Sequence, residues 1–190
     1  MPKTIQAPSL AQHDSQYGPV SDIWDSSGGP RWRLAADDFK TTGADSVSAV
    51  TWWGFYENAD TDCFDDYNTS GSEAEDLFTI TYYESVIHSQ TGERVPGSVI
   101  ASFDSNDLDI SRSEYFDQFV SGDIQVYMYT ATNDAVSFES GGCYFIEIKN
   151  SGGDTDGASG CHWRWNWSSD GDIQYAVKKA ESESSYANAS

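Results

Sequence analysis

The chain has 190 residues, with 31 acidic and 10 basic side chains and a formal net charge of −21. Such a charge repels the phosphate backbone of nucleic acids and the surface of anionic membranes, so we expect neither as a partner. No apolar run approaches the roughly 20 residues that a membrane-spanning helix needs, and we expect no membrane insertion.

The first 33 residues are interpreted as an N-terminal arm and linker. Residues 2–12 alternate weakly, with Ile5 and Ala7 on one side, while residues 11–33 carry Gly-Pro and Gly-Gly-Pro sequences that are typical of linkers. The arm either folds back on its own domain or adds a strand to the sheet of another copy. The candidate donated strand consists of Thr4, Ile5, Gln6, Ala7, Pro8, Ser9 and Leu10.

Residues 36–56 predict an antiparallel hairpin. Val47, Ala49 and Thr51 alternate with Ser46, Ser48 and Val50, which is the period-two pattern of a half-buried strand. The short run 37–39 is expected to pair with this strand through the polar turn at 42–45. The other strands of the domain should then cover the apolar face of this hairpin.

Further alternating runs follow along the chain. Phe78, Ile80 and Tyr82 share one strand face, and Phe145 and Glu147 alternate with Ile146 and its neighbours in a buried strand. No segment shows a helical period of useful length. We predict an all-β fold, an antiparallel β-sandwich of jelly-roll-like type with about 8 to 10 strands over residues 34–178, followed by a polar tail at 179–190.

Several motifs are similar to an uncharacterised group of secreted bacterial domains that is common in planctomycete-like genomes. They occur in a fixed order, ADDF then TWWG, FTITYYES, VPGSVIASF, IQVYMYTA, GGCYFIEIKN and CHWRWNWSSDGDIQYAV, between Leu34 and Val177. The resemblance implies a single extracellular sandwich domain without a known catalytic site. It leaves the N-terminal arm and the tail outside its pattern.

Three cysteines permit at most one disulfide bond within the chain. Cys143 and Cys161 each open a predicted strand and are the first choice as partners. A plain hairpin register would not bring them together, so the pair requires a different arrangement of strands. Cys63 bonded to either of them is the alternative.

The chain offers little recognisable chemistry. Its three histidines lack companions at metal-ligand spacing, and carboxylates are too numerous for any pair to indicate glycosidase activity. We therefore predict that the protein is not an enzyme and needs no cofactor. Calcium binding is a weaker alternative, based on acidic loops that match no twelve-residue calcium motif; their residues are Asp60, Asp62, Asp65, Asp66, Asp104, Asn106, Asp107 and Asp109.

Two functions are consistent with these observations. The first is an extracellular structural subunit, secreted or at the cell surface, whose copies form a filament or surface assembly through N-terminal strand donation. The alternative is a calcium-assisted carbohydrate-binding module in which Trp53, Trp163 and Trp165 form a platform for glycans. Since Trp163 and Trp165 share one strand face with Trp167, a sandwich core is the other interpretation of these indoles, and it is favoured.

Overall fold

The computed structural model of the chain shows β-strands throughout its described part, with no helix. In this part no helix is long and apolar enough to cross a membrane. The structure describes residues 22–26, 29–41, 45–57, 76–115, 126–151, 162–165, 177–180 and 187–188, with the burial of side chains given for 36–41, 46–54, 76–113, 127–151 and residue 163.

The described residues form strands of very different lengths. Those from β2 to β8 have 7 to 13 residues, whereas the last three have four residues or fewer. The strands are β1 (Asp22–Ser26), β2 (Gly29–Lys40), β3 (Asp45–Glu57), β4 (Phe78–Ile87), β5 (Arg94–Phe103), β6 (Asp109–Tyr115), β7 (Val126–Phe138), β8 (Cys143–Asn150), β9 (His162–Trp165), β10 (Val177–Ala180) and β11 (Ala187–Asn188).

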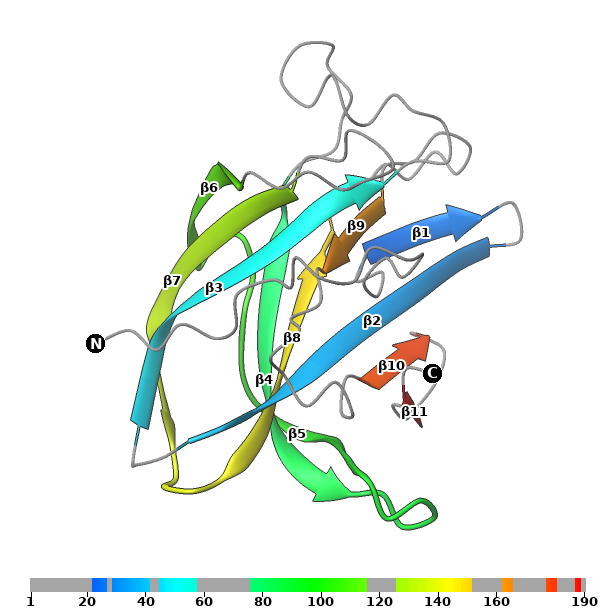
Figure 1. The fold of residues 1–190 in the computed structure, drawn as a ribbon, viewed down its shortest axis with the longest axis vertical. Coiled ribbons are helices and arrows are strands. Elements are labelled where there is room, and N and C mark those ends of the chain that lie inside the picture. The colour runs from blue at the N-terminus through cyan, green and yellow to red at the C-terminus, as the bar shows by residue number, and fades with distance from the viewer. Residues whose placement is uncertain are drawn as a thin grey trace.

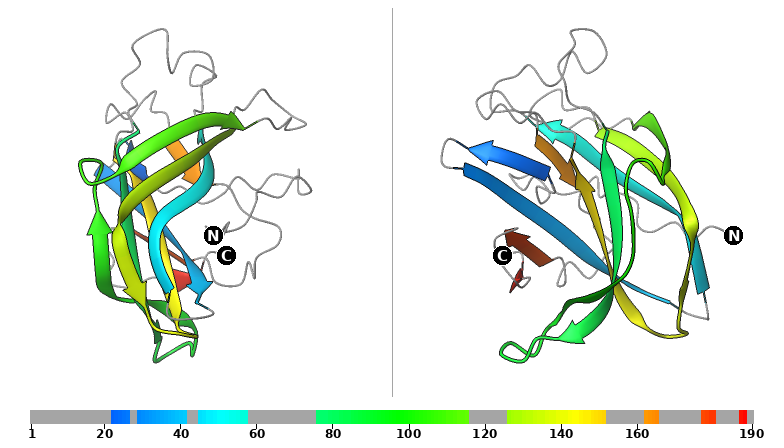
Figure 2. Two further views of the ribbon diagram at one scale, coloured as in Figure 1. Left: turned by 90° about the vertical axis from the view of Figure 1, so that its left-hand side faces the viewer. Right: turned by 180° about the vertical axis from the view of Figure 1, so that it is seen from behind.

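Two sheets pack face to face, which confirms the predicted all-β sandwich (Figures 1 and 2). The larger sheet has the strand order β11-β10-β2-β1-β8-β4-β5, with β2 also paired to β8, and the smaller sheet has the order β6-β7-β3-β9. Neighbouring strands are antiparallel except for one parallel contact between β1 and β8, at Asp22 and Asn150. Among the described strands, β5 therefore lies at one edge of the larger sheet.

The core between the sheets is built from large aromatic side chains. Phe78 packs edge-on against Trp163 with a centroid distance of 5.1 Å, and Trp52 stacks on Tyr129 at 5.4 Å. Phe78, Ile80 and Tyr82 of β4 lie in this core, as their alternation predicted. A second, smaller cluster on the other face of the larger sheet contains Ala36, Val95 and Phe145.

The predicted hairpin at 36–56 is wrong. β2 pairs with β8 from Ala36↔Glu147 to Lys40↔Cys143, whereas β3 pairs with β7 and β9 in the other sheet. The chain thus passes from one sheet to the other between β2 and β3. Local alternation specifies a strand, but it contains no information about which sheet accepts that strand.

Parts of the segments predicted as linker and tail form strands. Part of the linker forms β1 and the first residues of β2, which pair from Asp22↔Arg33 to Ser26↔Gly29. In the tail, β10 pairs with β2 from Val177↔Ala36 to Ala180↔Arg33. Residues 22–26 and 29–33, where a linker was expected, thus form paired strands.

Candidate functional site

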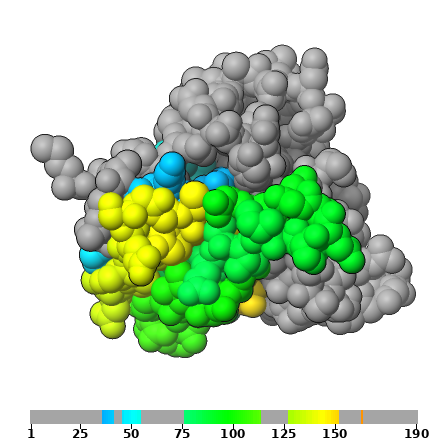
Figure 3. Space-filling view, turned by 90° about the horizontal axis from the view of Figure 1, so that it is seen from below, coloured from blue at the N-terminus to red at the C-terminus, as the bar shows by residue number. Residues whose placement is uncertain are grey.

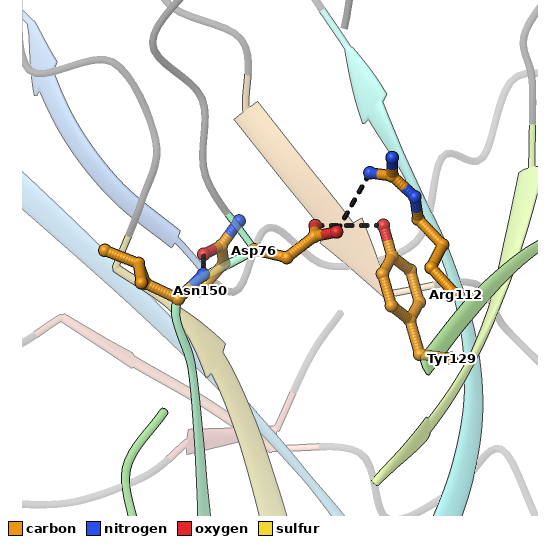
Figure 4. Close-up of polar contacts among 5 residues, drawn as sticks. Asp76, Arg112, Tyr129 and Asn150 are labelled. Atoms are coloured by element: carbon orange, nitrogen blue, oxygen red, sulfur yellow. Dashed lines mark hydrogen bonds and ion pairs between the residues drawn. The ribbon is translucent and has the colours of Figure 1, made fainter. Parts of the chain in front are cut away.

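A polar cluster joins the two sheets at the end of the sandwich where β8 ends and β4 begins. Arg112 of β6 makes an ion pair with Asp76, with 2.9 Å between Nη1 and Oδ2, and the Tyr129 hydroxyl of β7 donates to the other carboxylate oxygen at 3.3 Å (Figure 4). The Arg112 guanidinium also lies 4.8 Å from the centre of the Tyr127 ring. Both oxygens of Asp76 accept bonds, so this carboxylate connects the sheets.

Asn150 completes the cluster from the last residue of β8. Its side chain is 0 % exposed, and its Oδ1 accepts a hydrogen bond of 3.1 Å from the backbone N–H of Leu77 (Figure 4). The backbone of Ser151 donates to the Leu77 carbonyl at 2.8 Å. These bonds fix the junction between β8 and β4, and they give the cluster a structural role.

Two further acidic side chains, the half-buried Asp37 and the buried Glu147, lie on opposite faces of the larger sheet. Asp37 pairs with the core residue Ile146, so it lies on the core face, whereas Glu147 points the other way and accepts from the Tyr83 hydroxyl at 3.3 Å. Burial raises the pKa of Asp37 from 3.8 to about 6, and the neighbouring Asp38 carboxylate adds to this rise. Because the sheet separates Asp37 from Glu147, these two carboxylates cannot act together on one substrate.

The structure places two of the three candidate sugar-binding tryptophans inside the protein. Trp163 is 0 % exposed in the core, and Trp53 is 7 % exposed on the other face of β3. Neither indole offers an open face to a sugar ring in this placement, whereas the predicted alternative, a sandwich core, describes Trp163 well. The side chain of Trp165 lies outside the described set.

Only one of the two cysteines of the expected disulfide, Cys143, lies in the described part of the chain. Cys143 is a half-buried free thiol at the start of β8, where it lies opposite Lys40. His162, which follows Cys161 in the sequence, pairs with Glu57 at the far end of β3 (Figure 1). The start of β8 and the start of β9 thus lie at opposite ends of the sandwich. Cys63 and Cys161 themselves lie outside the described residues.

Of the two candidate calcium loops, only the one at 104–109 lies in the described part of the chain. Asp60, Asp62, Asp65 and Asp66 lie outside the described residues, whereas the corner at 104–107 is a local turn in which Asp104 Oδ1 accepts from the Asn106 N–H at 2.8 Å. Within the described residues no group of three or more acidic, histidine or cysteine side chains could hold a metal ion. The candidate donated strand, Thr4 to Leu10, also lies outside the described part of the chain.

The best candidate for a functional surface is the hairpin of β4 and β5. It carries four of the five large apolar side chains that are exposed among the described residues, with Val99 58 % and Ile87 57 % exposed. Figure 3 views the molecule from the end where this hairpin projects and shows its green surface facing the viewer. We call the four residues Val86, Ile87, Val99 and Ile100 the apolar edge surface.

The free edge of β5 has an unusual charge pattern for this chain. Arg94 is its first residue, and β5 contains no acidic side chain at all, although 31 residues of the chain are acidic. Two register shifts between β4 and β5, together with Pro96, which has no backbone N–H, interrupt the regular ladder. The part from Ala101 to Phe103, which pairs with Ile80 to Tyr82 without a shift, therefore has the more regular backbone for an added strand.

Sequence reasoning missed this surface, although a signal was present. Val86-Ile87 and Val99-Ile100 are adjacent apolar pairs, and neighbouring residues of a strand point to opposite faces. At the edge of a sheet, one member of such a pair is expected to face solvent or a partner. The two pairs lie on adjacent strands of one hairpin.

Residues 3–189 match a protein family described as Domain of unknown function (DUF7901), so the chain belongs to that family. No curated protein and no solved structure matches the chain. The matched span includes the N-terminal arm and nearly the whole tail, which the sequence resemblance had left outside its pattern. The arm is therefore a regular part of the family domain.

Proposed function

We propose that this member of the family is an extracellular structural subunit whose copies assemble by donating their N-terminal strand to a neighbour. The observation that carries the proposal is the apolar edge surface on the β4–β5 hairpin. An edge strand with exposed apolar side chains and few charges is a template for a strand from another chain. The segment Thr4–Leu10 is the strand we propose for that edge.

The energetics favour such a joint. Each backbone hydrogen bond between the donated strand and β5 contributes about 1 kcal/mol net. Burial of Val99 and Ile100 adds the free energy of removing apolar surface from water, about 25 cal/mol per Å². The joint must also overcome the repulsion between subunits with a charge of −21 each. A contact edge without carboxylates keeps that repulsion small where the chains meet.

The secreted location is part of the proposal and is supported by composition. The chain is rich in Ser, Gly, Asp, Thr and aromatic residues and poor in Lys and Arg, a balance that is common in secreted proteins. Since each subunit has one donor and one acceptor, head-to-tail joining produces a filament or a surface array.

Deletion of residues 1–12 tests the proposal. Sedimentation velocity and electron microscopy should show assemblies larger than a dimer for the full chain and none of that size for the truncated chain, while circular dichroism shows that the truncated chain keeps its β-sheet fold. Unchanged assembly after the deletion would falsify the proposed function.

A matched pair of full-length variants separates strand donation from a general effect of the arm. Ile5→Asp places a charge among the side chains proposed to face the acceptor, whereas Gln6→Asp places the same charge on the opposite side of the strand. We expect the first variant to abolish assembly and the second to retain most of it. Equal behaviour of the two variants would argue against a strand with one buried face.

A further inference from the structure

The edge strand β5 is flanked by opposite charges at its two ends. Arg94 is its first residue, and Asp104 follows directly after its last residue, Phe103. Both charged side chains are exposed, and the residues between them are uncharged. Arg94 lies five positions before Val99, and Asp104 lies five positions after it.

This pattern is self-complementary. When two copies of β5 approach in antiparallel orientation about a two-fold axis at Val99, Arg94 of each copy lies opposite Asp104 of the other. The same axis brings the two Val99 side chains, each 58 % exposed, to the centre of the contact. An apolar centre with a charged rim is the usual anatomy of a protein interface, and a two-fold contact uses the same patch twice.

The edge strand β6 of the smaller sheet carries more charged residues than β5. β6 carries Asp109, Arg112 and Glu114 along its seven residues, a charge pattern that discourages pairing between copies. β5 has no such protection along its length. In a chain with a charge of −21, a contact between two copies is most favourable where no carboxylates face each other.

We propose that two copies of this chain pair through their β5 edges in an antiparallel, two-fold dimer held by Val99, Ile100 and two Arg94–Asp104 ion pairs. Pro96 and the register shifts restrict the shared ladder, so side-chain contacts supply most of the affinity. The dimer occupies the edge that the donated strand uses, and the two therefore compete. That competition rests on the proposed function, whereas the dimer itself does not require the N-terminal arm.

Charge exchange tests the dimer. In sedimentation equilibrium at physiological salt, the full chain and the chain lacking residues 1–12 should both dimerise. Arg94→Asp or Asp104→Arg alone should raise the dimer dissociation constant by roughly tenfold or more, because symmetry places each repulsive pair in the contact twice. The double variant Arg94→Asp with Asp104→Arg should restore dimerisation to near the wild-type value.

Two controls isolate the ion pair. Asp107→Arg changes the net charge by the same amount as Asp104→Arg within the same exposed turn, and it should not weaken the dimer. Asp104→Asn keeps an acceptor for the Asn106 N–H but removes the charge, so it separates loss of the ion pair from loss of the turn. It should weaken the dimer by less than Asp104→Arg.

A monomeric wild-type chain at all concentrations, or single charge reversals that leave the dimer unchanged, would overturn the proposal. Failure of the double variant to recover would overturn the antiparallel register. These outcomes differ from failure of the proposed function, because that function fails when assemblies larger than a dimer survive deletion of residues 1–12, whether or not the dimer forms.

Discussion

Replacement of Gly54 by alanine tests the core packing on which the sandwich depends. A Cβ atom at Gly54 would lie 2.6 Å from Cζ2 of Trp163 and 2.7 Å from its Cε2 and Nε1 atoms. Carbon atoms in contact prefer about 3.5 to 4.0 Å, so the indole must move by about 1 Å. It cannot do so freely, because Trp163 is fully buried and packs edge-on against Phe78.

We expect Gly54→Ala to lower the free energy of unfolding by about 3 kcal/mol, at the upper end of ordinary overpacking. For a domain of this size, the melting temperature should fall by about 6 to 12 °C. Urea unfolding followed by tryptophan fluorescence measures the first quantity, and calorimetry measures the second.

Gly97→Ala is the matched control. Its added Cβ would lie equally close, 2.6 Å, to Cγ1 of Val86, but that side chain is 41 % exposed and can rotate away. We expect a loss below about 1 kcal/mol. Equal losses for the two variants, or a Gly54→Ala variant as stable as the wild type, would refute the placement of Trp163 over Gly54.

Two further predictions concern buried polar groups. Because the folded pKa of Asp37, about 6, lies above the ordinary 3.8, the native state loses stability as pH rises from about 4 to about 6. The free energy of unfolding of Asp37→Asn should therefore exceed that of the wild type at pH 7 by about 1 to 3 kcal/mol. Below about pH 4 the two free energies should become equal. A difference that does not change with pH would contradict this account. Asn150→Ala removes the buried side-chain acceptor of the Leu77 N–H and should cost about 1 to 3 kcal/mol in urea unfolding. Asn106→Ala, at an exposed turn, should cost less than about 0.5 kcal/mol, and an equal effect at both positions would show that the Asn150 bond does not hold the β8–β4 junction.

The sequence was sufficient for the fold class and for strands with uninterrupted alternation. Phe78, Ile80 and Tyr82 alternate without a break, and all three lie in the core. β3 shows where this reasoning fails, since a register shift between Val47 and Ala49 changes the alternation at Ser48. The core face of β3 therefore carries Val47, Val50 and Trp52, whereas simple alternation groups Val47 with Ala49 and Thr51.

Long-range pairing was the other limit. β10 is short, and two of its four residues are lysines; it is held as a strand by pairing with β2. The stabilising partner lies up to 147 positions away in the sequence, as between Arg33 and Ala180. The strand propensity of a short segment does not predict such a distant partner, because strand preference depends strongly on context.

The apolar edge surface could be predicted from the sequence only in part. The adjacent pairs Val86-Ile87 and Val99-Ile100 predict that some apolar side chains face outward, but only the strand order shows that β5 lies at an edge. The tryptophans show the reverse case, since sequence alone allows both a glycan platform and a core. The full burial of Trp163 follows from its position over Gly54 on the neighbouring strand, a contact that spacing in the sequence does not reveal.

Amide hydrogen exchange along β5 tests most directly whether copies of this chain meet at that edge. The exchange of residues 99–103 should be compared between assembled protein and a dissociated sample of the same chain. The proposed assembly predicts that exchange at these positions slows strongly on association, while the amides of β6 stay unchanged. Equal exchange of residues 99–103 in both samples would contradict the claim that the edge of the larger sheet joins the subunits.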